Sequence, residues 1–159
     1  MAVYPGTFDP VHFGHLDLIE RAARVFDTLL VGVGINPDKK TLFSLKERVD
    51  LIRKTTAHLS NVKVLPFTNL VVHFVRDSGA NIILRGMRTT SDLDYEFTMS
   101  LANMALDPGI ETVFLLARDI YSHLSSSLLK QVACLGGDLS KFLPDTVCQA
   151  MLKKTARLK

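Results

Sequence analysis

Hydrophobic positions along the chain fall into two kinds of segment. Five short clusters are apolar along nearly their whole length, at residues 2–4, 29–35, 62–65, 81–84 and 112–117. A short, continuously apolar run is typical of a strand that is buried on both faces. Between the clusters, apolar residues recur three or four positions apart, which is the spacing along one face of a helix. Strands that alternate with helices in this way predict an α/β fold, with a parallel five-stranded sheet and helices on both faces.

The helical segments also carry signals for their ends. In the first, Leu16, Ile19 and Ala23 share one face. At the start of the second, Ser44 and Glu47 have the spacing of a capping box. Glycine or proline follows several of the remaining segments and predicts where they end. We expect these further helices over residues 70–76, 91–106, 125–135 and 145–156.

The turn after the first cluster is unusual in its residue types. It reads GTFDPVHFGH (residues 6–15), so His12 and His15 flank the start of the first predicted helix. In parallel α/β sheets ligands bind at the carboxyl ends of the strands, and a helix amino terminus offers free N–H groups to phosphate. We therefore expect His15 to donate to a phosphate oxygen and His12 to face the same side. The alternative is that His15 only caps or packs locally and that His12 is a surface loop residue.

The ends of three other predicted strands are also rich in hydrogen-bond donors. Lys39 and Lys40 follow the second, Arg85 and Arg88 follow the fourth, and a serine triplet at 125–127 follows the fifth. Arginines that come directly after a buried strand suit bidentate phosphate contacts. The lysines could equally be solvated surface charge, and the serines could be a plain helix cap. Taken together, these donors predict a site for a ligand that carries phosphate.

Acidic residues and nucleotide-binding motifs restrict the chemistry further. Asp9, Asp92, Asp94 and Glu96 are scattered, so we expect no resident metal and a magnesium ion that arrives with the nucleotide. The chain has neither a P-loop motif nor a GxGxxG motif. Their absence argues against a P-loop ATPase and against a dinucleotide-binding oxidoreductase.

Composition and charge narrow the class of protein only a little. With 159 residues and 47% hydrophobic content, the chain is long enough for one core, so we expect a single domain over residues 1–159. A net charge of +3 suits an anionic small molecule as well as a nucleic acid. Cys134 and Cys148 are isolated and predict free thiols. With no leader segment and no long apolar run, we expect a cytoplasmic protein that spans no membrane.

Four sequence stretches together resemble one enzyme family. They are YPGTFDPVHFGH, LRGMR, DYE and YSHLSSS, in this order along the chain. In these stretches, and over essentially its whole length, the chain closely resembles the phosphopantetheine adenylyltransferases. The HxGH element alone would indicate only the wider nucleotidyltransferase superfamily, which includes the class I aminoacyl-tRNA synthetases.

This resemblance implies a Rossmann-like fold, a hexamer built as a dimer of trimers, and a specific reaction. The adenylyl group of ATP would pass to 4′-phosphopantetheine, giving dephospho-coenzyme A and pyrophosphate in coenzyme A biosynthesis. His15 would stabilise the transition state, with Lys39 and Arg88 as further catalytic donors. ATP would be bound by Thr7, Phe8, His15, Gly86, Met87, Arg88, Glu96, Tyr121, Ser122, His123, Leu124, Ser125, Ser126 and Ser127. Phosphopantetheine would be bound by Thr7, Lys39, Val71 and Arg85.

The chain departs from the usual family pattern near the expected nucleotide site. The family commonly has an aromatic residue and then isoleucine before the serines, where this chain has His123 and Leu124. Residues 89–94 are more polar than usual, and Arg118 and Asp119 add two charges after the fifth predicted strand. We expect these differences to alter the shape of the adenine pocket and to leave the phosphate ligands intact.

The expected chemistry needs few catalytic groups. A phosphate monoester dianion is already a nucleophile, so no general base is required, and positioning and electrostatics should supply most of the rate enhancement. Two other interpretations stay open: a sister nucleotidyltransferase, such as a nicotinamide or glycerol-phosphate enzyme, and a non-catalytic nucleotide sensor or RNA-binding module. The RNA-binding interpretation depends on the basic tail at 153–159, which lacks interleaved aromatic residues, so we expect no nucleic-acid partner.

Overall fold

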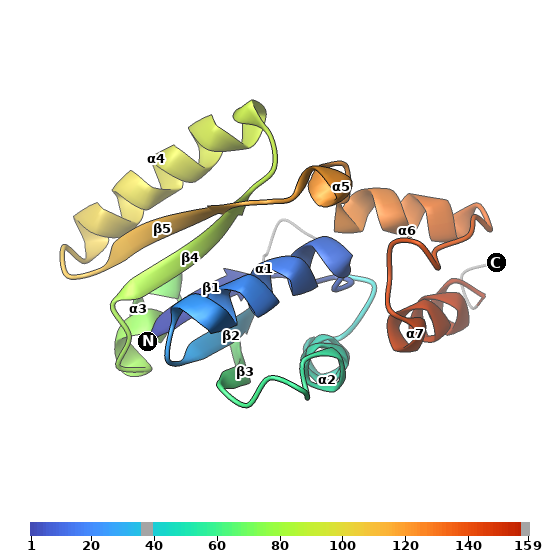
Figure 1. Ribbon diagram of the computed structural model, residues 1–159, viewed down its shortest axis with the longest axis horizontal. Helices are drawn as coiled ribbons and strands as arrows, with labels where there is room; N and C mark the ends of the chain where they lie inside the picture. Colours follow the sequence, from blue (N-terminus) through green and yellow to red (C-terminus); the bar gives the residue numbers. More distant parts are fainter. Residues whose placement is uncertain (36–39, 157–159) are drawn as a thin grey trace.

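One parallel sheet organises the chain, whose computed structural model describes residues 1–35 and 40–156 (Figure 1). Within these residues the sheet has five strands in the order β3-β2-β1-β4-β5, and all neighbouring strands pair in parallel. The strands are β1 (Ala2–Gly6), β2 (Leu29–Gly34), β3 (Val62–Phe67), β4 (Ile82–Met87) and β5 (Glu111–Leu116). The helices are α1 (Phe13–Val25), α2 (Leu45–Thr55), α3 (Val71–Asp77), α4 (Thr90–Leu106), α5 (Asp119–Ser122), α6 (Ser126–Cys134) and α7 (Asp145–Thr155).

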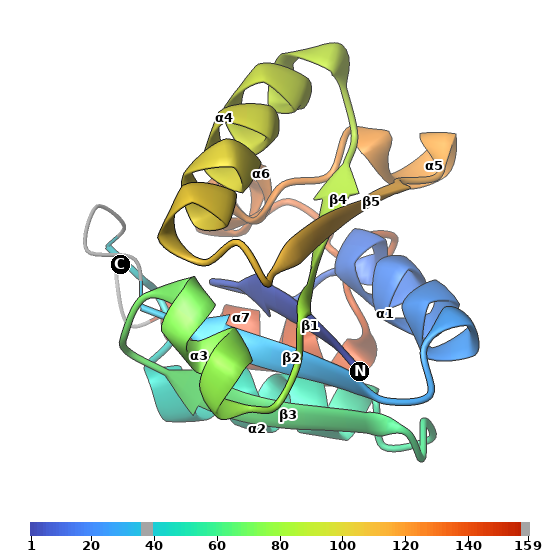
Figure 2. The same ribbon diagram turned by 90° about the vertical axis from the view of Figure 1, so that its left-hand side faces the viewer.

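Side chains along the strands alternate between the two faces of the sheet, and helices cover both faces. Tyr4, Val31 and Leu84 belong to a core that includes residues of α1, α2, α6 and α7. Val3 and Ile83, the neighbours of Tyr4 and Leu84 in sequence, belong to a smaller core with α3. Figure 2 shows α3 and α4 on one side of the sheet and α1 on the other. The predicted fold class, a Rossmann-like α/β fold, is therefore confirmed.

The fourth strand is longer than its apolar run predicted. Because β4 extends to Met87, Arg85 and Gly86 lie inside the strand rather than after it. Their backbone still pairs with β5. This pairing joins distant segments of the chain, and the polar side chain of Arg85 does not reveal it in the sequence. A Cβ atom on Gly86 would lie 2.3 Å from Cδ1 of Leu18, so glycine is what lets the strand pass this close to α1. The short helix α5 was not predicted from the sequence at all.

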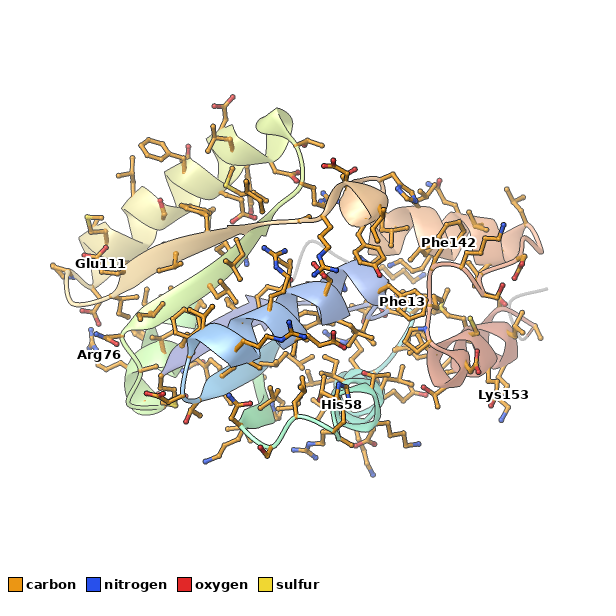
Figure 3. The ribbon with its side chains drawn as sticks, in the orientation of Figure 1. Phe13, His58, Arg76, Glu111, Phe142 and Lys153 are labelled. Atoms are coloured by element: carbon orange, nitrogen blue, oxygen red, sulfur yellow. The ribbon has the colours of Figure 1, made fainter. Side chains whose placement is uncertain are left out.

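The sheet opens beside β1, where the chain changes direction across it. β1 pairs with β2 along its whole length, from Ala2 to Gly6, but with β4 only at Ala2 and Val3. Beyond Val3, β1 and β4 therefore separate towards their carboxyl ends, as strands do at the ligand-binding switch point of this fold class. In Figure 3, Phe13, the first residue of α1, marks the carboxyl-terminal end of the strands, and Glu111, the first residue of β5, marks their amino-terminal end.

Two further sequence-based expectations concern the environment of the protein. No helix within the described ranges is long and apolar enough to cross a bilayer. Both cysteines are free, as predicted: Cys134 is exposed and Cys148 is partly buried.

Candidate active site

The HxGH element forms the amino terminus of α1. His12 is the N-cap residue and His15 is the third residue of the helix. The His15 N–H donates to Nδ1 of His12 (3.4 Å), and the His12 N–H donates to Nδ1 of His15 (3.3 Å). The two side chains thus form a reciprocal capping box, with their rings stacked at a centroid distance of 3.7 Å. A Cβ atom on Gly14 would lie 3.1 Å from the His12 ring, so the glycine between them makes room for this arrangement.

This capping assigns the tautomer of both imidazoles. Because Nδ1 of each ring accepts a backbone N–H, each neutral ring carries its proton on Nε2. Burial, together with the positive charge of Arg88, lowers the pKa of His12 to about 3. The pKa of His15 lies well below its ordinary value. Burial is the largest cause, and electrostatic interaction with His12 and with Arg88 adds to it. At neutral pH both histidines are therefore uncharged, and both offer an Nε2–H donor.

The two interpretations of the histidine pair are not exclusive. Both histidines cap the helix locally, as the simpler interpretation of His15 stated. The alternative that His12 is a surface loop residue is wrong, because the residue is 4% exposed. Both rings also line the same cavity, so the cap and the site are one structure.

The loop from β1 to α1 is held from behind by buried polar contacts. Asp9 is 2% exposed, and its carboxylate accepts hydrogen bonds from the N–H groups of Leu42 (2.8 Å) and Phe43 (2.9 Å) and from Nζ of Lys130 (2.9 Å). Phe8 has a left-handed backbone conformation with φ of 49°, and its ring packs edge-on against neighbouring aromatic rings. A left-handed residue other than glycine costs free energy, so the surrounding contacts must stabilise it.

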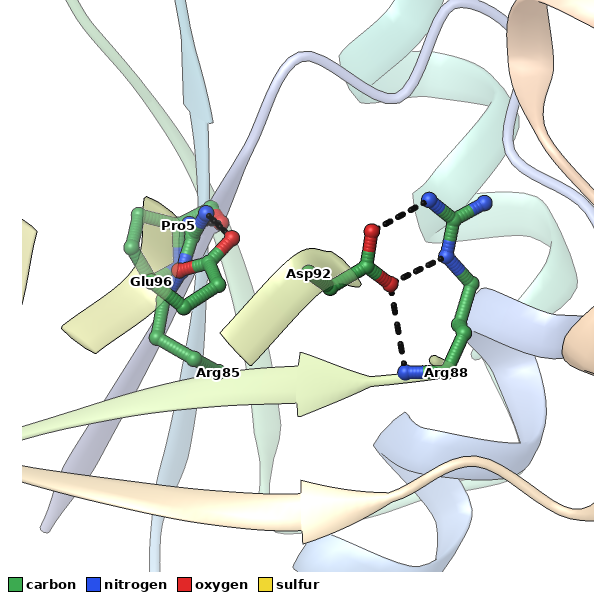
Figure 4. Close-up of polar contacts among 5 residues, drawn as sticks. All are labelled: Pro5, Arg85, Arg88, Asp92 and Glu96. Carbon is green, nitrogen blue, oxygen red and sulfur yellow. Dashed lines mark hydrogen bonds and ion pairs between the residues drawn. The ribbon is translucent and has the colours of Figure 1, made fainter. Parts of the chain in front are cut away.

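Arg85 projects from β4 into the opening between β1 and β4. Its Nε and Nη2 atoms donate to the two carboxylate oxygens of Glu96 on α4, each at 2.6 Å, and its Nη1 donates to the Pro5 carbonyl at 3.1 Å (Figure 4). Burial alone would lower the pKa of Arg85, but the hydrogen bonds and charge of Glu96 outweigh burial and raise it. The bidentate pair therefore ties α4 to the switch point.

Arg88, just after β4, is held in a similar way by Asp92, which lies one turn before Glu96 on α4. Its Nε (3.1 Å) and Nη2 (3.2 Å) donate to Asp92, and its Nη1 donates to the Leu124 carbonyl (2.7 Å). Burial would raise the pKa of Asp92, but the hydrogen bonds and charge of Arg88 lower it (Figure 4). A guanidinium has five N–H groups, so these contacts leave further donors on both terminal nitrogens of Arg88 for a ligand.

The serine triplet both caps α6 and lines the site. Ser125 is the N-cap, and its hydroxyl accepts the Leu128 N–H at 3.2 Å. The Ser126 hydroxyl donates to the Pro10 carbonyl at 2.9 Å, which fastens the start of α6 to the β1–α1 loop. Two helix amino termini, those of α1 and α6, therefore meet at one edge of the sheet, where their free N–H groups favour anions.

Two adjoining cavities open at this edge. The first has a volume of about 320 Å³ and is lined by the amino termini of α1 and α6 and by the end of β4. The second has a volume of about 630 Å³ and lies between α3, α4 and the end of β2. Residues that line both are Pro5, Gly6, Arg85, Arg88, Asp92 and Glu96. The two arginines and their carboxylate partners therefore form the wall that the cavities share.

Most of the predicted site residues lie around these cavities. The first cavity is lined by Phe8, His15, Gly86, Arg88, Glu96, Tyr121, Leu124, Ser125, Ser126 and Ser127. The second is lined by Thr7, Val71 and Arg85. Met87, Ser122 and His123 line neither of the two. Lys39 lies outside the described residues, and its neighbour Lys40 is exposed.

The residues that depart from the family pattern have partners of their own. The His123 ring packs edge-on against Phe142, at a centroid distance of 6.1 Å. Leu124 is buried and its carbonyl accepts a hydrogen bond from Arg88. Nε of Arg118 lies 3.1 Å from the Asp17 carboxylate on α1. The altered shape of an adenine pocket stays a prediction.

Apart from Glu96, which the family resemblance had assigned to ATP binding, sequence reasoning missed the polar face of α4. Asp92 and Glu96 seemed scattered, yet Glu96 pairs with Arg85 of β4 and Asp92 pairs with Arg88, which follows β4 directly. Further along the helix, Ser100 and the buried Asn103 line the second cavity. Positions 92, 96, 100 and 103 are spaced by four, four and three residues, which is one face of a helix. That spacing was the available signal for these residues.

The site offers many hydrogen-bond donors to an anion. Within residues 1–35 and 40–156 no three His, Cys, Asp or Glu side chains are grouped so that they could hold a metal ion. The cationic and N–H groups come from β4, α1 and α6, and the nearby carboxylates are already paired. The arrangement can bind and align phosphate groups on either side of Arg85 and Arg88.

Comparison with known proteins also indicates an enzyme that acts on phosphate groups. Residues 3–132 match the cytidylyltransferase-like family. The chain is 50% identical over 155 residues to a phosphopantetheine adenylyltransferase of Clostridium botulinum (strain Eklund 17B / Type B), covering 98% of each chain. It is 50% identical to that of Rhodopirellula baltica, covering 98% of this chain and 89% of the relative.

A solved structure supports the fold independently. A Vibrio parahaemolyticus protein described as a nicotinate-nucleotide adenylyltransferase superposes with a TM-score of 0.67, covering 95% of this chain and 97% of the other, at 17% sequence identity. At this identity the likeness concerns the fold alone. The identities near 50% over almost the full length are what decide the family, and this chain belongs to the phosphopantetheine adenylyltransferases.

Proposed function

We propose that this nucleotidyltransferase transfers the adenylyl group of ATP to 4′-phosphopantetheine, forming dephospho-coenzyme A and releasing pyrophosphate. The observation that carries the proposal is the pair of adjoining cavities, which share Arg85 and Arg88. Two phosphorylated substrates must meet at one phosphorus atom, and a shared cationic wall allows them to do so. The names of the close relatives supply the identity of the two substrates.

ATP fits the first cavity by its chemistry. A triphosphate there would lie between the amino termini of α1 and α6, which supply free N–H groups and positive dipole ends. His15, as a neutral Nε2–H donor, suits an oxygen on the α-phosphoryl group, because a neutral donor binds developing charge without repelling Arg88. The serines at the start of α6 suit the pyrophosphate that departs.

Phosphopantetheine fits the second cavity. Arg85 lines both cavities, Thr7 lines the second and follows the shared residue Gly6, and both side chains suit the attacking phosphate. Further in, Val71 and Met99 offer apolar surface to the pantetheine arm. Asn103 is 8% exposed and lines the same cavity, and its amide can pair with the amide groups of that arm.

The proposed step is an in-line displacement. A phosphate oxygen of phosphopantetheine attacks the α-phosphorus of ATP, and the bond from that phosphorus to the bridging oxygen of the β-phosphate breaks. Pyrophosphate leaves with that electron pair. Because the attacking phosphate oxygen is already deprotonated, no proton has to be removed from the nucleophile. The chain's contribution is alignment and charge stabilisation by His15, Arg88 and, as the family resemblance implies, Lys39. Magnesium enters as part of the MgATP substrate, and the reaction takes place in the cytoplasm.

The flank formed by α4 supports a homo-oligomer, which we propose to be the hexamer of the family. Leu93, Phe97, Leu101 and Met104 are spaced by four, four and three residues and are exposed by 42%, 54%, 49% and 43%. This apolar stripe runs beside the polar face of α4 that lines the site. The neighbouring edge strand β5 and α5 add Leu116 and Ile120, exposed by 68% and 63%. Exposed apolar side chains in this number suit contact with a second copy of the chain.

A single assay tests the proposed reaction. Purified protein is incubated with MgATP and 4′-phosphopantetheine, and pyrophosphate and dephospho-coenzyme A are measured together. Formation of both in equal amounts is expected. Pyrophosphate release with nicotinate mononucleotide or glycerol phosphate instead would favour a sister nucleotidyltransferase, and ATP binding without turnover would favour a nucleotide sensor.

A further inference from the structure

Arg48 is a buried cation behind the candidate active site. Arg48 is 2% exposed, and its Nη1 donates to the carbonyls of Thr7 (2.5 Å) and Gly34 (2.8 Å). These two carbonyls belong to different strand exits, after β1 and at the end of β2. Thr7 and Gly34 both line the second cavity. One guanidinium thus joins two parts of the wall from the side away from the ligand space.

Local energetics do not favour an arginine at this position. Arg48 lies in the first turn of α2, where the helix dipole disfavours a cation. Among the described residues it forms no ion pair with a carboxylate, and its buried Nε has no hydrogen-bond partner. Burial lowers the pKa of Arg48, partly opposed by the charge of Asp9. An unpartnered buried polar group costs free energy, so a role beyond stability is the better explanation for this side chain.

The peptide that Arg48 holds is part of the site. Because the C=O and N–H of a trans peptide point in opposite directions, a Thr7 carbonyl directed at Arg48 turns the Phe8 N–H away from it. Phe8 is also the residue with the left-handed φ of 49°. The Arg48 contact therefore fixes the backbone at the point where the loop is most strained.

We propose that Arg48 is a positioning residue for the second substrate: by joining the Thr7 and Gly34 carbonyls, it holds Thr7 where the attacking phosphate is received. The inference rests on the proposed function. Arg48 lines neither of the two cavities of the site. Its effect falls on the alignment of the nucleophile, because its hydrogen bonds go to Thr7 and Gly34 of the second cavity and, among the described residues, none joins it to His12, His15 or the serine triplet of the first.

The chain offers a matched control on the same helix. Arg53 of α2 also donates to a main-chain carbonyl, that of Val64 on β3, at 2.9 Å. It lines neither of the two cavities of the site. Arg48→Lys and Arg53→Lys each keep a cation and remove a guanidinium–carbonyl contact. A difference between the two variants therefore reflects where the lost contact lies, and a shared effect reflects the loss of such a contact in general.

Steady-state kinetics of pyrophosphate release, calorimetric binding of each substrate and thermal unfolding test the proposal. For Arg48→Lys we expect the KM for phosphopantetheine to rise roughly tenfold and kcat to fall roughly 10- to 100-fold, as small misplacements of reacting groups do. Binding of a non-hydrolysable ATP analogue should change by less than about threefold. Arg53→Lys should resemble the wild type. Arg48→Met extends the series if it folds.

Four outcomes would overturn the inference. Wild-type kinetics in Arg48→Lys would show that the contact does not matter for alignment. Equal losses of ATP-analogue and phosphopantetheine binding, in proportion to a lower melting temperature, would show a purely structural role, as would equal effects of Arg53→Lys. A wild-type protein that releases no pyrophosphate would overturn the proposed function itself, and the inference with it.

Discussion

The β1–α1 loop and helix α4 line the same cavities but differ in how their polar and apolar groups are partnered. Around the loop, buried polar groups find their partners within the chain: Asp9 with Lys130, Arg48 with Thr7, and the two histidines with each other. Helix α4 turns its polar face inwards to Arg85 of β4 and to Arg88 just after that strand, and leaves an apolar stripe exposed. The loop is complete in one chain, whereas the α4 flank is suited to a neighbour.

This difference teaches what each region contributes. Groups that act at the reacting phosphorus must be held rigidly, and buried hydrogen bonds give that rigidity at a cost in desolvation. The α4 flank carries a wall of the second cavity, and its outer stripe gives a partner something apolar to cover. Breaking the loop should therefore change catalysis, and breaking the stripe should change assembly.

The largest expected effect is that of His15→Ala. Loss of one preorganised donor to a transition state typically lowers kcat by ~10²–10³, so we expect at least a hundredfold loss with a modest change in ATP binding. Steady-state kinetics and calorimetry measure both. His58→Ala is the control, because His58 is exposed and its neighbour is Glu20, far from the site. A normal kcat with only a raised KM would make His15 a ground-state binding residue.

Arg85→Ala and Arg88→Ala should affect different substrates, one in each cavity. Loss of a hydrogen bond to a charged group costs roughly 1.5–3 kcal/mol, which is about 10- to 100-fold in affinity. We expect Arg85→Ala chiefly to weaken phosphopantetheine binding and Arg88→Ala chiefly to impair the use of ATP. Calorimetry with each ligand checks this, with Arg76→Ala, whose partner is Asp107, as the control. Equal weakening of the same ligand by both changes would contradict the assignment.

Phe97→Glu should break the α4 stripe without touching the site. A charge at the centre of an exposed apolar surface opposes association, because it would have to be desolvated there. We expect a smaller assembly by light scattering with an unchanged circular dichroism spectrum. Leu135→Glu is the control, since Leu135 is 88% exposed on another part of the surface. An unchanged mass for Phe97→Glu, or an equal loss with Leu135→Glu, would contradict a stripe-mediated assembly.

The smallest expected effect concerns stability below neutral pH. Burial lowers the pKa of His12 to about 3, so the folded state binds fewer protons than the unfolded chain between that pH and about 6.5. The contribution of His12 to stability is therefore present above about pH 6.5 and is lost as the pH falls. Asn is a good N-cap, so His12→Asn keeps the cap and removes the titration.

Urea denaturation at pH 7 and pH 5 measures this effect. The free energy of unfolding should fall less between these pH values in His12→Asn than in the wild type. His58→Asn, at an exposed histidine, should keep the wild-type slope. The same slope in all three proteins would contradict a buried neutral His12.

Much of the fold and part of the site were predictable from the residue pattern. The order of strands and helices follows from apolar runs and helical spacing, which are local properties. The HxGH turn was expected at a strand exit and a helix start, and it lies there. The end of β4 was misjudged, because ladder pairing with β5 continues through Arg85 regardless of its side chain.

The sequence by itself determined the alternation of elements, and with it the edge of the sheet at which the donors gather. Only the tertiary structure decided which buried groups are partners. Arg48 and Thr7 are 41 positions apart, and Lys130 and Asp9 are 121 apart. Local spacing encodes which face a residue occupies, but the choice of partner depends on how distant segments pack. That is why Asp92 and Glu96 seemed scattered in the sequence and stand beside the arginines in the fold.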